Sequence, residues 1–271
     1  MSVLLMLVSA AVIILAVRYG LLKGLDHLGG ALNWSAKARG QATGYATSVP
    51  EFVCLVAAGL AGVWEAGLWN IASSNIINAL LMTVAVVGYR QWRDLFHRRF
   101  IDEIGFALAA VAVPVVLMGM DLDTSWIVVP VLLGFFLVYR VVDARVNTSP
   151  PSTEPDQASG DLRLGLVFLI SGLATIAVAG AFLGDATEAV VNAMGVHPAA
   201  AGWILGLCTS LPEMVTFFAV YAGAKESGEI VGLGDTQEAL DNLTASNMAN
   251  VGLIYPIGLA VYLVVTLWVV A

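Results

Sequence analysis

The chain has few charged residues and almost no cysteine, and both shortages narrow the class of protein. Only 12% of its 271 residues are charged and only two are cysteines, whereas 59% are hydrophobic and the mean hydropathy is +0.87. So apolar a composition excludes an ordinary soluble domain and indicates an integral membrane protein. Cys54 and Cys208 have no paired spacing, which argues against a disulfide framework and against a zinc site.

The sequence also lacks the motifs that would identify an enzyme or a nucleic-acid-binding protein. It contains no nucleophile motif, no phosphate-binding loop and no metal-hydrolase motif. The net charge of −8 argues against the positively charged surface that binds DNA or RNA. We therefore expect a protein that is not an enzyme, holds no cofactor and has membrane lipid and inorganic cations as its partners.

Long apolar runs predict the fold class. Windows of about 17–25 apolar residues, the length that crosses a bilayer, indicate an all-α polytopic membrane protein. The expected spans lie near residues 2–18, 42–62, 67–89, 104–120, 125–142, 163–183 and 198–222, and an eighth begins close to 239. A ninth would follow if Pro256 starts a short terminal helix. The Pro- and Ser-rich residues within 146–162 predict a cytoplasmic linker between a first half, 1–145, and a second half, 163–271.

The distribution of charge predicts the orientation. Alternate threading of these spans places all 12 basic residues on one side of the membrane. The opposite connections carry only acidic residues, namely Glu65, Asp121, Asp123, Asp185 and Glu188. By the positive-inside rule the basic loops are cytoplasmic and the N-terminus is outside. We expect the protein in a cell membrane, the plasma or inner membrane.

One polar motif occurs twice within this apolar sequence. Residues 47–51 read Thr-Ser-Val-Pro-Glu and residues 209–213 read Thr-Ser-Leu-Pro-Glu, 162 positions later. A second pair follows, Ser-Asn-Ile-Ile-Asn at 74–78 and Ser-Asn-Met-Ala-Asn at 246–250, 172 positions apart. Because the two copies cross the membrane in opposite directions, they predict inverted repeats with a binding site near the bilayer midplane.

The motif supplies the groups that a hard cation binds. An ionisable residue within a membrane span costs about 2.5–3.5 kcal/mol on insertion scales, so Glu51 and Glu213 indicate a functional site. Pro50 and Pro212 disturb the helical ladder and predict broken helices with freed carbonyl oxygens. The other candidate ligands are glycines that allow close backbone approach and hydroxyl or amide groups at helical spacing: Gly44, Gly206, Thr47, Thr209, Ser74, Ser246, Asn78 and Asn250. Each threonine lies four residues before the glutamate of its motif, so we expect the hydroxyl and the carboxylate to share one helix face. This oxygen set suits Ca²⁺ or Na⁺.

These paired motifs resemble the two alpha repeats of the calcium/cation antiporter superfamily, which includes the sodium/calcium exchangers. The resemblance covers about 40–89 and 195–255, and the second copy matches better. It implies alternating access, with cations bound between spans two, three, seven and eight. Glu51 and Glu213 would be the central ligands, shared between Ca²⁺ and competing Na⁺ or H⁺. Thr47 and Thr209 would add oxygens, Ser74 and Ser246 would complete flanking Na⁺ sites, and Asn78 and Asn250 would face the middle of the pocket.

Three departures from the family pattern bear on this expectation. Ala46 and Cys208 stand where the family usually has Gly. Asn250 stands where some members have Asp, which leaves one fewer titratable group. Only 21 residues follow Asn250, so the family's usual ten spans shrink to eight or nine and the second half is shortened at its C-terminus. A second copy or a partner chain would compensate for the shortened half.

Several interpretations stay open at this stage. The leading one is a secondary antiporter that exchanges Ca²⁺, or a related cation, for Na⁺. The alternatives are a proton-coupled cation exchanger and a non-transporting membrane subunit or cation sensor that retains the repeats. Ser48, Ser210, Asn75 and Asn247 fit helix packing as well as ligation. Asp241 could attract cations at the inner mouth, but a solvated residue at the positive end of span eight is the simpler expectation.

Overall fold

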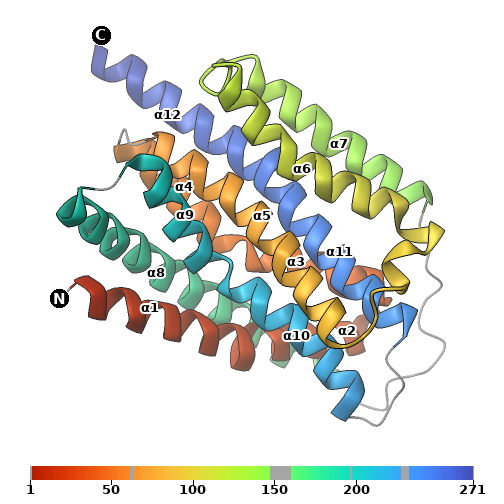
Figure 1. The fold of residues 1–271 in the computed structure, drawn as a ribbon. Helices are drawn as coiled ribbons and strands as arrows, with labels where there is room; N and C mark the ends of the chain where they lie inside the picture. The colour runs from red at the N-terminus through yellow and green to blue at the C-terminus, as the bar shows by residue number, and fades with distance from the viewer. Residues whose placement is uncertain (1, 62–63, 147–159, 196, 227–231, 271) are drawn as a thin grey trace.

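The computed structural model describes all residues except 1, 62–63, 147–159, 196, 227–231 and 271. Every regular element among the described residues is a helix, as the all-α prediction requires (Figure 1). Most of the predicted linker at 146–162, namely residues 147–159, lies outside the described residues.

The helices join into rods, four of which contain more than one helix and continue through a π-helical turn or a break. The elements are α1 (Ser2–Ala16), η1 (Val17–Leu21), α2 (Leu22–Leu32), α3 (Ala36–Thr47), α4 (Val49–Ala61), α5 (Trp64–Gly88), η2 (Asp94–Phe96), η3 (Arg98–Phe100), α6 (Ile101–Gly119), α7 (Val128–Val146), α8 (Leu162–Met194), α9 (Pro198–Thr209), α10 (Leu211–Glu226), α11 (Leu233–Ala249), η4 (Asn250–Ile254) and α12 (Tyr255–Val270). The short elements η2 and η3 belong to the connection between α5 and α6.

Six helical segments of the described residues are long and apolar enough to cross a membrane. They are Leu4–Leu32, Trp64–Gly88, Arg98–Gly119, Leu162–Ala186, Pro198–Glu226 and Leu233–Leu267. Two further rods, α3 with α4 and α7 alone, coincide with the predicted spans at 42–62 and 125–142. Both carry buried charged residues near one end, Lys37 on α3 and Asp143 on α7, which lowers their apolar content.

The terminal helix foreseen near Pro256 is present as α12, which begins at Tyr255 and continues the rod of α11 instead of forming a separate ninth span. The helix runs on from α11 through η4 into α12, so that Pro256 lies in the first turn of α12. Proline is tolerated there because the preceding π-helical turn already interrupts the regular hydrogen-bond ladder.

Glycine brings the two halves of the chain into close contact. Helix α3 packs along α11, and α9 packs along α5 (Figure 1). A side chain at Gly44 would overlap the Asn242 carbonyl oxygen, and one at Gly206 would overlap Ser73 Oγ. Small residues of this kind allow membrane helices to approach closely. The first half-helix of each repeat, α3 or α9, therefore lies against the partner helix of the other repeat, α11 or α5.

Apolar clusters surround the place where these four rods meet. One cluster joins α4, α5, α7 and α12 around Leu55 and Tyr255, and a second joins α5, α10 and α11 around Met82 and Phe217. A third packs α1 and α8 against the start of α4, around Ile176. The polar motifs are enclosed between these clusters.

Candidate cation site

Both motif-bearing rods break at the same position of the repeat. Ser48 separates α3 from α4 with φ −79° and ψ 3°, and Ser210 separates α9 from α10 with φ −79° and ψ 2°. Proline follows two residues later in each case and has no N–H to continue the ladder. The break places Glu51 and Glu213 in the first turn of α4 and α10, where the helix dipole favours negative charge.

Glu51 is connected to both repeats. Its side chain is fully buried, and its Oε1 accepts a hydrogen bond from Ser74 Oγ on α5 at 2.7 Å. The Ser74 hydroxyl lies 3.1 Å from Ser210 Oγ, at the break of the second repeat. The first carboxylate is therefore linked through a serine of its own repeat to a serine of the other.

Glu213 has the same arrangement with the repeats exchanged. It is also fully buried, and its Oε1 accepts from Ser246 Oγ on α11 at 2.9 Å. Ser246 Oγ lies 2.9 Å from Ser48 Oγ, at the break of the first repeat. The matching contacts show that the two repeats form one site with internal pseudosymmetry.

Four asparagines bond in pairs between α5 and the rod formed by α11 and η4. Asn250 Nδ2 donates to Asn75 Oδ1 at 2.8 Å, and Asn78 Nδ2 donates to Asn247 Oδ1 at 3.3 Å. These two bonds are equivalent under the repeat. All four side chains are completely buried.

Four buried oxygens at matched positions have no hydrogen-bond partner among the described residues. They are Glu51 Oε2, Glu213 Oε2, Asn78 Oδ1 and Asn250 Oδ1. A buried acceptor without a partner costs about 1–3 kcal/mol, and more when it is charged. A bound cation would remove this cost, and carboxylate and amide oxygens are the ligands that Ca²⁺ and Na⁺ prefer.

The threonines occupy the site differently from the sequence-based expectation. Thr47 does not share a helix face with Glu51, because the break at Ser48 interrupts the helix between them. Instead Thr47 lies beside Glu213, and Thr209 lies beside Glu51. Each threonine hydroxyl also donates to the glycine carbonyl three residues earlier, from Thr47 to Gly44 at 3.3 Å and from Thr209 to Gly206 at 3.4 Å.

Another matched pair was missed in the sequence. Asn70 and Asn242 are buried and lie 172 positions apart, one helical turn before Ser74 and Ser246. Asn70 Oδ1 accepts from Thr209 Oγ1 at 3.1 Å, and Asn242 Nδ2 donates to Thr216 Oγ1 at 2.7 Å. The constant offset of 172 residues was the signal that could have identified them.

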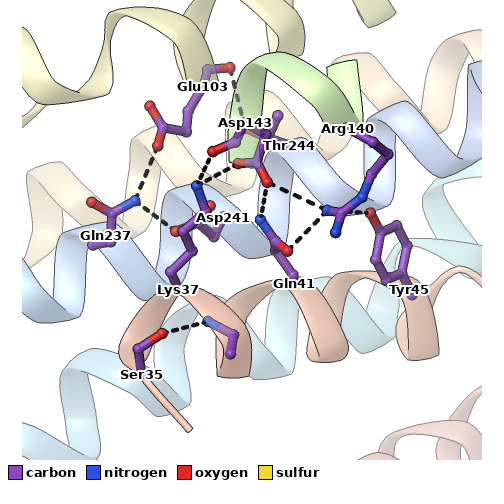
Figure 2. A network of polar contacts seen from close by, with 11 residues as sticks. Ser35, Lys37, Gln41, Tyr45, Glu103, Arg140, Asp143, Gln237, Asp241 and Thr244 are labelled. Carbon is purple, nitrogen blue, oxygen red and sulfur yellow. Dashed lines mark hydrogen bonds and ion pairs between the residues drawn. The ribbon is translucent and has the colours of Figure 1, made fainter. Parts of the chain in front are cut away.

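A second polar network lies toward the N-terminal ends of α3 and α11. Figure 2 shows Lys37, whose Nζ is 2.7 Å from Asp143 Oδ1 and donates to the Asp143 carbonyl at 2.8 Å. Gln41 Nε2 donates to Asp143 Oδ2 at 2.9 Å, and Arg140 donates to Gln41 Oε1 and Tyr45 OH. The network joins α3 to α7.

Asp241 belongs to this network, and the expectation that it is solvated is wrong. Its side chain is only 1% exposed, because α3 and α6 cover the first turns of α11. Gln237 Nε2 donates to Asp241 Oδ2 at 2.6 Å and to Glu103 Oε1 at 3.1 Å (Figure 2). This amide joins the carboxylates of α11 and α6.

All candidate cation ligands belong to the two repeats. The described residues contain no group of three or more His, Cys, Asp or Glu that could hold a metal. A cation in this site would therefore be bound by two carboxylates, with hydroxyl, amide and carbonyl oxygens completing its coordination.

Comparisons with known proteins show which family model and which folds the chain resembles. Residues 164–269 match the family model described as sodium/calcium exchanger protein. The solved structure of the sodium-calcium exchanger NCX_Mj soaked with 100 mM Na⁺ and 10 mM Sr²⁺ is 20% identical, with a TM-score of 0.60 over 99% of this chain and 90% of that chain. The crystal structure of the H⁺/Ca²⁺ exchanger CAX is 13% identical, with a TM-score of 0.60 over 98% of this chain and 68% of that chain. No curated protein sequence matches this chain.

The comparisons confirm the resemblance to the calcium/cation antiporter superfamily. Residues 164–269 are similar in sequence to the sodium/calcium exchanger family, and the whole chain is similar in fold to NCX_Mj and CAX. The apolar helices and the family match indicate an integral membrane protein, and the proteins that the chain resembles are exchangers.

Proposed function

We propose that the protein is a secondary antiporter that exchanges Ca²⁺, or a related cation, for Na⁺ by alternating access. The observation that carries this proposal is the set of four buried, unpartnered oxygens on Glu51, Glu213, Asn78 and Asn250. They come from matched positions of the two repeats, on α4 and α10 for the glutamates and on α5 and η4 for the asparagines. The family match and the similar exchanger structures support the same conclusion.

The proposed ligands follow from these contacts. Glu51 and Glu213 are the central ligands, which Ca²⁺ and Na⁺ occupy in turn. The oxygens around them complete the coordination as the ion requires: Thr47, Thr209, Ser74, Ser246, Asn78 and Asn250, with the carbonyl groups of Gly44 and Gly206. The serines bond to the carboxylates, so they both position the ligands and supply hydroxyl oxygens for flanking Na⁺.

Coupling follows from the charge of the site. Two ionised carboxylates without a counter-charge are costly to carry through a membrane. The loaded site can reorient, whereas the empty site reorients at a much higher energetic cost. Transport in one direction therefore requires return with another cation, which is the property of an antiporter.

The proposal includes the division of the chain into two halves, its orientation in the membrane and the membrane in which it lies. The halves 1–145 and 163–271 each carry one repeat, and the basic connections are cytoplasmic with the N-terminus outside. A plasma or inner membrane suits an exchanger that uses a Na⁺ gradient.

Proton coupling is the second candidate. The H⁺/Ca²⁺ exchanger CAX is similar in fold at a TM-score of 0.60. A carboxyl group enclosed by apolar clusters can alternate between a metal ion and a proton. A non-transporting subunit or cation sensor would bind cations without carrying them.

Ca²⁺ uptake into proteoliposomes separates these functions. One set of vesicles has an outward Na⁺ gradient, a second has a pH gradient, and a third has neither. Uptake that needs the Na⁺ gradient supports the proposal, and uptake that needs the pH gradient supports proton coupling. Cation-dependent stabilisation of the folded protein without uptake in any vesicle would contradict transport and indicate a sensor or subunit.

A further inference from the structure

The connection between α5 and α6 concentrates basic residues at one end of the helix bundle. Residues 89–100 read Tyr-Arg-Gln-Trp-Arg-Asp-Leu-Phe-His-Arg-Arg-Phe and hold four of the chain's 12 basic residues, with one acidic residue. We call this segment the α5–α6 loop. Both helices that it joins belong to segments long and apolar enough to cross a membrane, and it lies at the end of the bundle where α10 ends and α11 begins (Figure 1). The loop therefore lies where a bilayer meets water.

Three side chains anchor the loop to the helices of the second repeat. The ring of Tyr89 stacks on that of Tyr221 on α10, with the centroids 5.2 Å apart. Asp94 Oδ2 accepts a hydrogen bond from Thr236 Oγ1 on α11 at 3.3 Å. Phe100 is completely buried in the apolar cluster of α5, α10 and α11. The single acidic residue of the loop is thus used in an internal contact.

The exposed side chains of the loop are cationic and aromatic. Trp92 is 49% exposed and Phe96 is 80% exposed, and their ring centroids lie 6.3 Å apart in an edge-to-face arrangement. Arg93 Cζ lies 5.4 Å from the centroid of the Trp92 ring. Arg90 and Arg98 are also exposed. Guanidinium groups and large apolar rings therefore share one surface.

The two kinds of side chain suit the two parts of an anionic phospholipid. Guanidinium groups form charge-assisted, bidentate hydrogen bonds with phosphate, and basic residues beside a membrane span are attracted to anionic leaflets. Aromatic rings partition into the interface between headgroups and acyl chains. We propose that the α5–α6 loop is a binding surface for anionic phospholipids, with its arginines on the headgroup phosphates and with Trp92 and Phe96 at the acyl-chain boundary. The proposal involves no transported ion and goes beyond the proposed function.

The two rings favour a lipid over a soluble phosphate as the ligand. A soluble anion would contact the arginines and leave Trp92 and Phe96 in water, whereas a membrane interface covers them. With the orientation proposed above, the loop faces the cytoplasmic leaflet, which carries anionic lipid. Because the loop is anchored to α10 and α11, a bound lipid should stabilise the folded protein.

Lipid-dependent thermal unfolding of the full chain in a neutral detergent tests the proposal. The unfolding midpoint is measured at increasing concentrations of phosphatidylglycerol, of phosphatidylcholine and of glycerol 3-phosphate. We expect phosphatidylglycerol to raise the midpoint at lower concentration than phosphatidylcholine, and glycerol 3-phosphate to leave it unchanged. Equal responses to the two lipids would overturn the proposal. A response to glycerol 3-phosphate as large as that to phosphatidylglycerol would also overturn it, because a soluble phosphate would then be the ligand.

Two double variants with the same loss of charge separate the loop from general attraction between the protein and anionic lipid. One carries Arg93→Gln and Arg98→Gln, and the other carries Arg145→Gln and Arg163→Gln, which remove exposed arginines at the end of α7 and the start of α8. An arginine near an anionic surface strengthens binding about fivefold, so we expect the half-saturating phosphatidylglycerol concentration to rise about 25-fold in the loop variant. An equal rise in both variants, or no rise in the loop variant, would overturn the proposal.

A third variant, Trp92→Ser with Phe96→Ser, tests the aromatic part of the surface. We expect its half-saturating phosphatidylglycerol concentration to rise although every arginine is present. The anchors Tyr89, Asp94 and Phe100 are unchanged in all these variants, so without lipid their midpoints should equal that of the wild type. Wild-type affinity after loss of both rings would refute the two-part surface. Because no ion gradient is used, a failure of exchange in proteoliposomes would leave this result unaffected.

Discussion

Ser48 and Ser246 lie with their hydroxyl oxygens 2.9 Å apart, although 198 positions separate them in the sequence. Ser246 also donates to Glu213, so the break in the first repeat is in direct contact with the carboxylate system of the second. The equivalent contact between Ser74 and Ser210 completes the pseudosymmetry. One shared site therefore depends on both repeats, and a change in either repeat should affect the whole site.

Removal of either central carboxylate should abolish exchange. Glu51→Gln and Glu213→Gln each leave one ionised ligand, which cannot balance a divalent cation. We expect gradient-driven Ca²⁺ uptake to fall to the level of protein-free vesicles in both variants. Glu65→Gln is the matched control, because Glu65 is exposed at the start of α5. We expect this variant to transport Ca²⁺ at the wild-type rate. Wild-type uptake in either central variant would show that the carboxylates are not shared ligands.

The serines that bond to the carboxylates should set cation affinity. Ser74→Ala and Ser246→Ala remove a hydrogen bond to a charged group, worth about 1.5–3 kcal/mol, together with a hydroxyl ligand. We expect the half-saturating Ca²⁺ concentration to rise about tenfold or more, measured by uptake at varied Ca²⁺. Ser171→Ala is the control, since its hydroxyl is exposed and donates within α8. Equal affinities in all three variants would contradict the assignment.

The two close-packing glycines should be required for stability. Gly44→Ala and Gly206→Ala place a methyl group against the backbone of the facing helix, and overpacking of this kind costs about 1–3 kcal/mol. We expect a lower midpoint of thermal unfolding in detergent for both variants. Gly105→Ala serves as the control, because a side chain at Gly105 would meet nothing within 4 Å. A midpoint for Gly44→Ala as high as that of Gly105→Ala would mean that the helices have room to separate.

The ion pair of the second network should matter for stability more than for cation affinity. Lys37→Met removes the closest cation of the buried Asp143, which keeps only the neutral donor Gln41 at 2.9 Å and the longer contact to Arg140 at 3.4 Å. Breaking a buried pair destabilises by up to about 3–5 kcal/mol, so we expect a clearly lower unfolding midpoint. Lys37→Met combined with Asp143→Leu should recover part of the loss. A double variant less stable than the single one would show that the pair is not the cause.

The sequence predicted those parts of the structure that depend on local chemistry and on the repeat. The spans, the breaks near Pro50 and Pro212, and the identity of the residues that meet between the repeats could be read from apolar length and matched spacing. Their roles as cation ligands remain a prediction.

The errors arose where contacts cross between distant segments. Thr47 was placed with Glu51 by helical spacing, but spacing cannot be carried across a broken helix. Asp241 was expected to be solvated because nothing in its own segment indicates that α3 and α6 cover it. The Ala110 carbonyl, which orients Asn75, has no sequence signal at all, because every residue has a carbonyl.

The central claim is that both repeats form one cation site, and calorimetric Ca²⁺ binding to the purified protein tests it most directly. Titrations are made at increasing Na⁺ concentration for three proteins. They are the wild type, a double variant that carries both Glu51→Gln and Glu213→Gln, and the single variant Glu65→Gln. The account predicts Ca²⁺ binding that weakens as Na⁺ rises, persists in Glu65→Gln and is lost in the double variant. Ca²⁺ binding that survives the loss of both central carboxylates would contradict it.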